Sequence, residues 1–273
     1  MTAALTSNFA VTDDEMTVLA ARLGVQALPV VLDLRGRHHT QTALAEAVEM
    51  ATRSLHGRGL IRDGEVVAEL GGLVQSLQRP DRELAMRFVT PDGLCRVSVV
   101  RKGAQCVCAR RIGTDITLTR LEGSAGIADI AAAAKVLLGQ LPDSTPADIG
   151  AVGAPLDQAS QALSGGADAV QLADSIRALG AEPRTAMLLG SALSARQAFA
   201  EIVYYALDPD EDRVLRKPAA VGVFYTKRGR IVAAPSSSPS GQLWTTLKAG
   251  SDHAIKQAIG QLAELSGYRW GDC

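Results

Sequence analysis

Hydrophobic positions along this chain follow two spacings, and the same succession of spacings occurs twice. The segments Val97–Arg111 (VSVVRKGAQCVCARR) and Val221–Pro235 (VGVFYTKRGRIVAAP) each predict a strand, a basic turn at Gly103 or Gly229, and a second strand. A third strand and an apolar helix are expected after each segment. The repetition predicts that two copies of one unit build a single sheet.

The segments before these hairpins support an internal duplication. Ser76–Phe88 (SLQRPDRELAMRF) precedes the first hairpin much as Ala192–Tyr205 (ALSARQAFAEIVYY) precedes the second. The second copy then carries an extra charged stretch, DPDEDRVLRK, which predicts an exposed loop. A Pro- and Ser-containing linker near residue 145 separates the copies. We therefore expect an N-terminal half, residues 1–145, and a C-terminal half, residues 146–273, within one domain.

Helical and alternating spacings give the other expected elements. A capping box at Thr12 and Glu15 begins the first helix, which Gly24 ends. Further helices are expected over Thr40–His56, Glu65–Leu77, Ile127–Leu138, Pro155–Leu163, Ala167–Leu179, Glu182–Ala206, and from Asp252 onward. Strands are expected over Pro29–Leu34, within a three-strand unit from about Leu84 to Leu121, and over Ala219–Thr226, Arg230–Ala234 and Leu243–Leu247.

Charge and hydropathy narrow the classes of partner. The chain of 273 residues has 28 basic and 29 acidic residues, and this balance argues against a nucleic-acid or anionic-membrane surface. No stretch approaches the roughly 18 uninterrupted apolar residues of a membrane-spanning helix, and the first residues have no signal-peptide pattern. We expect a cytoplasmic protein with no stable membrane association.

Candidate chemistry is sparse. Cys106 and Cys108 share one side of a predicted strand and Cys95 lies on its partner strand, but no histidine follows with a zinc-binding spacing. These cysteines are expected to be small buried apolar residues. No nucleophile elbow, phosphate loop or metalloprotease motif occurs. The sequence therefore predicts no metal, no cofactor and no enzyme, although an enzyme with an unfamiliar site stays as an alternative.

The later strands carry a surface that suits a protein partner. Alternation places Val221, Val223 and Tyr225 on one face and Gly222, Phe224 and Thr226 on the other. In the last strand it places Trp244 and Thr246 opposite Leu243, Thr245 and Leu247. A mixed apolar and hydroxyl face is typical of a protein interface. The alternative is that helices cover both faces and these residues belong to the core.

The order of these motifs resembles the EspG family, the mycobacterial chaperones of type VII (ESX) secretion. The resemblance rests on AVGVFYTKRGRIVAAP from Ala220, G-x-x-W-x-T from Gly241, the following L-x-x-G-S-D, and LVQSLQRPDRELAMRF from Leu73. It also includes LGVQALPVVLDL near the start, so it covers about Val11 to Leu265. One departure is Tyr225, which stands where a small acidic residue is expected.

The resemblance implies the fold and the function. It implies an α+β fold with quasi-two-fold duplication, a central mainly antiparallel sheet and two helical bundles. It also implies a cytosolic, non-enzymatic chaperone that binds the helical tip of a PPE protein in a PE–PPE heterodimer, keeps the pair soluble and directs it to its secretion system. A structural or ligand-sensing subunit of the secretion machinery is the alternative function, and a homodimer of the unbound chain stays open.

The resemblance also suggests contact residues on the sheet. The expected partner-binding residues are Phe224, Thr226, Arg230 and Val232 on the second hairpin, Trp244 and Thr246 on the last strand, and Arg101, Lys102 and Gln105 at the first hairpin. Aromatic and arginine side chains are the usual hot spots of such surfaces. We expect Phe224→Arg to abolish partner binding without unfolding the protein.

Overall fold

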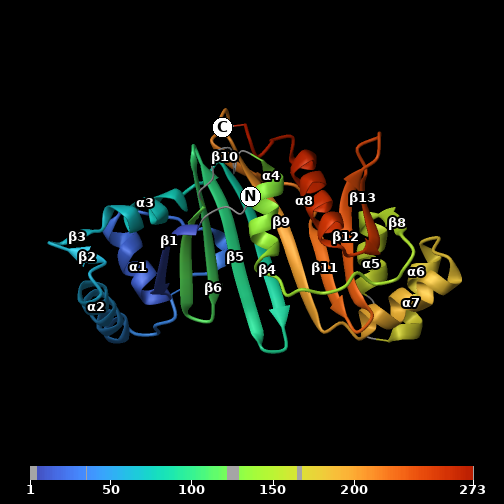
Figure 1. Ribbon diagram of the computed structural model, residues 1–273, viewed down its shortest axis with the longest axis horizontal. Coiled ribbons are helices and arrows are strands. Elements are labelled where there is room, and N and C mark those ends of the chain that lie inside the picture. Colours follow the sequence, from blue (N-terminus) through green and yellow to red (C-terminus); the bar gives the residue numbers. More distant parts are fainter. Residues whose placement is uncertain (1–4, 35, 122–128, 165–167, 273) are drawn as a thin grey trace.

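The computed structural model describes residues 5–34, 36–121, 129–164 and 168–272. Their main feature is one eleven-stranded sheet whose paired strands are all antiparallel (Figure 1). The strands are β1 (Leu5–Thr12), β4 (Arg82–Thr90), β5 (Gly93–Lys102), β6 (Gln105–Ile112), β7 (Asp115–Leu121), β8 (Val152–Pro155), β9 (Ala198–Asp208), β10 (Arg213–Arg216), β11 (Val221–Thr226), β12 (Gly229–Ser237) and β13 (Leu243–Ala249), beside a small hairpin of β2 (Ile61–Arg62) and β3 (Glu65–Val66). The helices are α1 (Asp13–Arg22), the 3-10 helix η1 (Val30–Leu32), α2 (Gln41–Gly57), α3 (Ala68–Ser76), α4 (Ile130–Leu138), α5 (Leu156–Ser164), α6 (Ala169–Ala178), α7 (Pro183–Ser194) and α8 (Asp252–Ser266).

The strand order is symmetric about its centre. It runs β1-β7-β6-β5-β4-β9-β11-β12-β13-β8, with β10 beside β9, so β4 and β9 form a seam between two equivalent halves. Each half has an edge strand, three α-helices, a four-strand meander and a last helix, in that order. This arrangement confirms the predicted α+β fold with quasi-two-fold duplication and a central antiparallel sheet.

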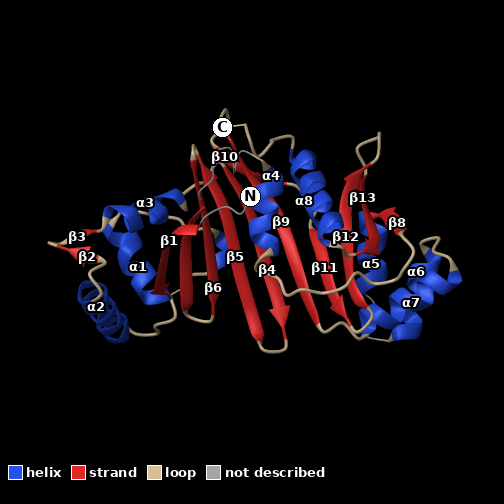
Figure 2. Ribbon diagram, viewed as in Figure 1, coloured by secondary structure: helices blue, strands red, loops and turns tan. Residues whose placement is uncertain are grey.

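Helices cover the two faces of the sheet differently (Figure 2). On the face that we call closed, α4 and α8 pack against each other and against the central strands, and they bury the largest apolar cluster. On the opposite face, α1, α2 and α3 cover the N-terminal end, and α5, α6 and α7 cover the C-terminal end. Between these bundles lies the open face, which we define by Ala85, Arg87, Glu201, Val203 and Tyr205 on β4 and β9.

The predicted long helix over Glu182–Ala206 is wrong. Helix α7 ends at Ser194, and the chain continues as β9, in which Ala200, Ile202 and Tyr204 face the closed side. The segment AFAEIVYYALD has the apolar alternation of a strand. It also follows α7 directly and continues the helical spacing of apolar residues, so the sequence fits either element. Pairing with β4 and β11 decides for the strand.

Three other expectations also need correction. The expected strand at Pro29–Leu34 is the 3-10 helix η1, which Asp33 ends in a left-handed conformation (φ 51°). The extra charged stretch contains β10, because its backbone pairs with the outer part of β9 while its side chains stay in solvent. Each half has four strands in its meander instead of three, because β4 and β9 belong to the upstream segments.

The helix starts follow the sequence signals. The Thr12 hydroxyl accepts a hydrogen bond from the Glu15 backbone N–H at 3.2 Å, and the Glu15 carboxylate accepts one from the Thr12 N–H at 2.8 Å, which forms the predicted capping box. At α8, the Ser251 hydroxyl accepts a hydrogen bond from the N–H of Ala254. The expected Ile127–Leu138 helix is α4, whose first expected residues, 127 and 128, lie outside the described part.

The connection between the halves is anchored to the sheet. Residues 145–147 lie beside the start of β12, where the Arg230 N–H donates to Thr145 O and the Ala147 N–H donates to Arg230 O. The approach requires glycine at position 229, because a Cβ there would lie 2.7 Å from Thr145 O. The linker expected near residue 145 is thus held at its C-terminal end.

Candidate partner-binding surface

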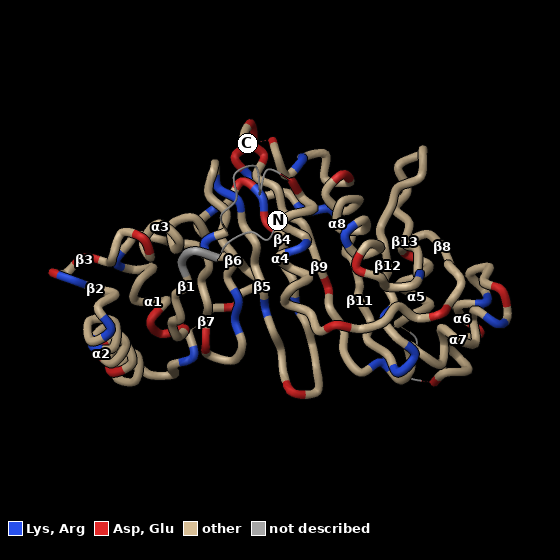
Figure 3. Tube along the Cα trace, viewed as in Figure 1, with Lys and Arg blue, Asp and Glu red and all other residues tan. Residues whose placement is uncertain are grey.

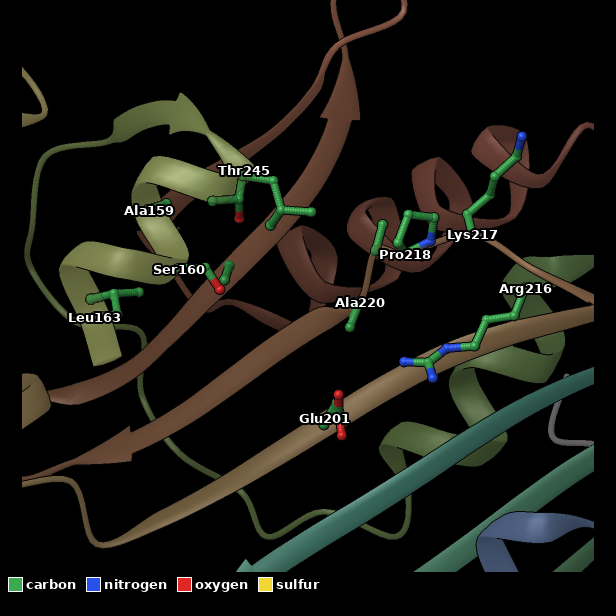
Figure 4. Close-up of a pocket in the computed structure, with 12 residues that line it drawn as sticks. Ala159, Ser160, Leu163, Glu201, Arg216, Lys217, Pro218, Ala220 and Thr245 are labelled. Carbon is green, nitrogen blue, oxygen red and sulfur yellow. The ribbon is translucent and has the colours of Figure 1, made fainter. Parts of the chain in front are cut away.

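A pocket opens on the C-terminal side of the open face. It has a volume of about 520 Å³ and lies between α5, the β10–β11 connection and strands β9, β12 and β13 (Figure 4). We call it the α5 pocket. Its lining is mostly small or apolar, and comprises Leu156, Ala159, Ser160, Leu163, Glu201, Arg216, Lys217, Pro218, Ala219, Ala220, Ala233 and Thr245.

A second pocket of about 330 Å³ continues across the centre of the open face. We call it the central pocket. Ala85 and Val203 form part of its floor, and Val30 and Val31 of η1 form its N-terminal rim. Glu201 and Arg216 line both pockets, so the two hollows meet at these side chains.

Charged side chains on the open face are mostly paired with one another. Arg87 and Glu201 lie opposite each other on β4 and β9 and form an ion pair. Arg96 on β5 reaches Asp33 beside η1 at 2.7 Å. The surface therefore combines small apolar floor residues with charged side chains that are mostly paired, which suits contact with a protein.

Glu83 is a buried carboxyl group beneath this surface. Its side chain accepts a hydrogen bond from the Ser98 hydroxyl at 2.7 Å, and only 7% of the residue is exposed. Burial raises the pKa of Glu83 to about 7, although the Ser98 hydrogen bond acts in the opposite direction.

The structure separates the residues that the sequence analysis grouped on the second hairpin. Phe224 lies on the side of the α5 to α7 bundle, with its ring 5.1 Å from that of Phe199, and Thr226 is buried with its hydroxyl donating to Gly229 O. Phe224→Arg would therefore disturb packing as well as any partner contact. Arg230 and Val232 are buried from the opposite side, where Arg230 pairs with Asp252 and Val232 joins the closed-face core.

The strand β13 shows the same division. Trp244 and Thr246 are half-buried and lie on the side of the closed face, whereas Thr245 between them lines the α5 pocket. Tyr225 also faces the closed side, where its hydroxyl donates to Pro142 O at 3.0 Å. The alternation expected for these strands is correct, but on β13 it is the neighbouring Thr245 that lines the α5 pocket.

The first hairpin tip lies at the other end of the sheet. Lys102 donates to Gln78 O at 2.7 Å, Gln105 accepts from the Ser76 hydroxyl at 2.6 Å, and Arg101 donates to Trp270 O. The strand pairing places Arg101 seven residues along β4 from the level of Phe224, about 23 Å at roughly 3.3 Å per residue. One compact contact does not include both hairpin tips.

Several residues of the two pockets were not identified from the sequence. The sequence predicts a helix over Glu201, Val203 and Tyr205, which lie on β9, and a loop at Arg216, which lies on β10. Their period-two spacing, and the match of Ala192–Tyr205 to Ser76–Phe88, were the signals that could have identified them. Ser160 and Leu163 gave no such signal, because an amphipathic helix does not say which strands it covers.

The remaining expectations concern cysteines, metals and membranes. Cys106 and Cys108 are buried in the closed-face core, as predicted, whereas Cys95 is only half-buried against it. Burial raises the pKa of the Cys108 thiol to about 12. In the described part of the chain, no His, Cys, Asp or Glu side chains gather as metal ligands would. No helix there combines the length and apolar character needed to cross a membrane.

Basic and acidic residues occur at both ends of the molecule and on its central strands (Figure 3).

Two proteins to which this chain is similar are both ESX secretion-associated proteins. The chain is 29% identical over 260 residues to the ESX-1 secretion-associated protein EspG1 of Mycobacterium marinum, covering 93% of this chain and 87% of that protein. It is 25% identical to the ESX-3 secretion-associated protein EspG3 of Mycolicibacterium smegmatis, covering 95% and 87%.

A solved structure shares the fold. The Mycobacterium tuberculosis type VII secretion system chaperone EspG5, determined in complex with the PE25–PPE41 dimer, matches with a TM-score of 0.81 and 19% sequence identity, covering 97% of this chain and 99% of that one. The model of the EspG family matches residues 12–261. Because this match spans nearly the whole sequence, the chain belongs to the EspG family.

Proposed function

We propose that this protein is a chaperone of type VII secretion that binds the PPE subunit of a PE–PPE heterodimer. It covers the apolar helical tip of the PPE protein, keeps the pair soluble and directs it to its ESX system. It acts by binding, without catalysis, in the cytosol where the pair is made.

One observation carries the proposal: an apolar pocket that adjoins an uncovered stretch of the central sheet. The α5 pocket and the central pocket adjoin each other at Glu201 and Arg216, between the two helical bundles. An apolar helical tip left in water promotes aggregation, and a concave surface of small apolar residues removes that tip from solvent. Membership of the EspG family, and the likeness to the EspG5 structure determined in complex with the PE25–PPE41 dimer, support a PE–PPE pair as the occupant.

The contact that we propose lies on the second half of the molecule. Ser160 on α5, Ala220 before β11 and Thr245 on β13 face the α5 pocket, so a helical tip would lie between α5 and the sheet. Phe224 supports this surface from within the third apolar cluster. Buried Arg230 and Val232 serve the fold in this proposal.

Co-expression tests the proposal. The full chain is produced with PE–PPE pairs drawn from each ESX locus of one genome, and each mixture is passed over a size-exclusion column. Co-elution with the pairs of one locus, and not with the others, is the expected result and names the secretion system. A folded chain that co-elutes with none of the pairs would overturn the proposal and favour a structural or sensing subunit.

A further inference from the structure

Arg216 stands at the point where the two pockets meet. It ends β10, lies directly opposite Tyr205 on β9, and lines both the α5 pocket and the central pocket. Its guanidinium carbon is 5.9 Å from the centre of the Tyr205 ring, a cation–π distance that holds the side chain over the sheet. Figure 4 shows the guanidinium extended toward Glu201, whereas the neighbouring Lys217 extends the other way.

Arg216 has no counter-charge of its own in the described part of the chain. Glu201 is engaged by Arg87, and Asp33 by Arg96. If Arg216 moved to pair with Glu201, Arg87 would lose its partner, so the local sum of charges would not change. Three basic residues (Arg87, Arg96 and Arg216) and two acidic residues (Asp33 and Glu201) line the central pocket, so its charged lining carries one excess positive charge.

A partner that covers this surface would remove that charge from water. A buried cation without a counter-charge is strongly unfavourable, whereas an arginine and a carboxylate form paired, charge-assisted hydrogen bonds. We propose that Arg216 receives a carboxylate of the bound partner, and so selects PPE proteins that carry Asp or Glu beside the apolar tip. This inference rests on the proposed function and adds the chemistry of the preferred partner.

The charge of Arg216 is tested in a complex that the wild-type chain forms. Titration calorimetry with the co-eluting PE–PPE pair compares Arg216→Lys, Arg216→Gln and Arg216→Glu. Arg213→Gln and Arg213→Glu are matched controls, because Arg213 lies on the same short strand, alternates to its other side and is paired with Glu211. Circular dichroism and thermal melting verify that each variant is folded.

We expect Arg216→Gln to weaken binding roughly 30-fold and Arg216→Glu by more, with Arg216→Lys closer to wild type and both Arg213 variants unchanged. An Asp or Glu to Arg substitution near the PPE tip should restore binding of Arg216→Glu. Wild-type affinity for Arg216→Glu, or equal losses for the Arg213 and Arg216 variants, would overturn the inference while leaving the proposed function intact. If the wild-type chain binds no pair at all, the proposed function fails first.

Discussion

The hairpins β5–β6 and β11–β12 occupy equivalent places in the two halves but differ where they meet the open face. Counted from the turn, Arg96 and Arg111 of the first hairpin correspond to Ala220 and Pro235 of the second. Arg111 donates to Leu32 O at 2.6 Å, and Arg96 pairs with Asp33. The two arginines thus hold η1 on the first hairpin.

Among the described residues of the second half, no segment fills the same place. Only four residues, 165–168, join α5 to α6, whereas the connection between α1 and α2 spans residues 23–40 and includes η1. Ala220 leaves space that becomes part of the α5 pocket. One half therefore covers its strands with its own chain, and the other leaves them available to another protein.

Blocking the α5 pocket should have the largest effect. Ser160 is exposed on α5 and lines the pocket, so Ser160→Arg puts a long charged side chain into it without burying anything in the core. We expect binding of the PE–PPE pair to fall by about 100-fold or more, which corresponds to about 3 kcal/mol. Calorimetry measures the loss.

Gln158→Arg provides the control, since Gln158 is exposed on the same helix and does not line the pocket. If Ser160→Arg binds the PE–PPE pair with the same affinity as Gln158→Arg, the partner does not contact the α5 pocket.

Releasing η1 should cost stability in the first half. Arg111→Ala leaves the carbonyl oxygens of Leu32 and Asp33 without this donor, and we expect the free energy of unfolding to fall by about 2–3 kcal/mol. Urea denaturation measures the change. The neighbouring Arg110→Ala is the control, because the buried Nε of Arg110 has no hydrogen-bond partner among the described residues, and a loss below about 1 kcal/mol is expected there.

The seam between the halves should show a pH effect through Glu83. Its pKa is about 7 in the folded protein, above the ordinary value of 4.5, so the folded state binds more protons and stability falls as the pH rises through this window. Glu83→Gln removes the titration. We expect the variant to match wild type at pH 5 and to exceed it by up to about 2 kcal/mol at pH 8, in urea unfolding at both values. If the difference in free energy of unfolding between Glu83→Gln and wild type is the same at pH 5 and at pH 8, this assignment is contradicted.

The smallest effect is expected at η1 itself. Val30 is 83% exposed at the rim of the central pocket, and Val30→Ser should change affinity for the partner by less than about threefold if the second half carries the main contact. A loss of affinity above about tenfold would show that both halves contact the partner, and would contradict the assignment of the main contact to the second half.

The sequence predicted the elements whose signals are local. Thr12 with Glu15 and Ser251 mark helix starts by their own hydrogen bonds, and the two hairpin turns fall where the basic and glycine residues place them. The duplication was visible because equivalent strands kept their apolar alternation.

The sequence failed where the decision belongs to neighbours. Segment 198–208 becomes a strand because β4 and β11 pair with it, and the charged residues 213–216 pair because β9 extends beyond β11. The prediction of the candidate surface failed for the same reason. Alternation separates Thr245 from Thr246, but only the positions of α5 and α8 decide which of them lines the α5 pocket. Such information is absent from any single segment.

The antiparallel seam of β4 and β9 also bears on how such a molecule could arise. Along this seam Glu83 pairs with Tyr205 and Val89 with Phe199, so equivalent strands of the two halves run antiparallel, as they do across the isologous interface of a two-fold symmetric homodimer. A homodimer must place the same side chain at both equivalent sites. Within one polypeptide the two halves are free of this constraint, and the equivalent positions hold Arg96 in one half and Ala220 in the other.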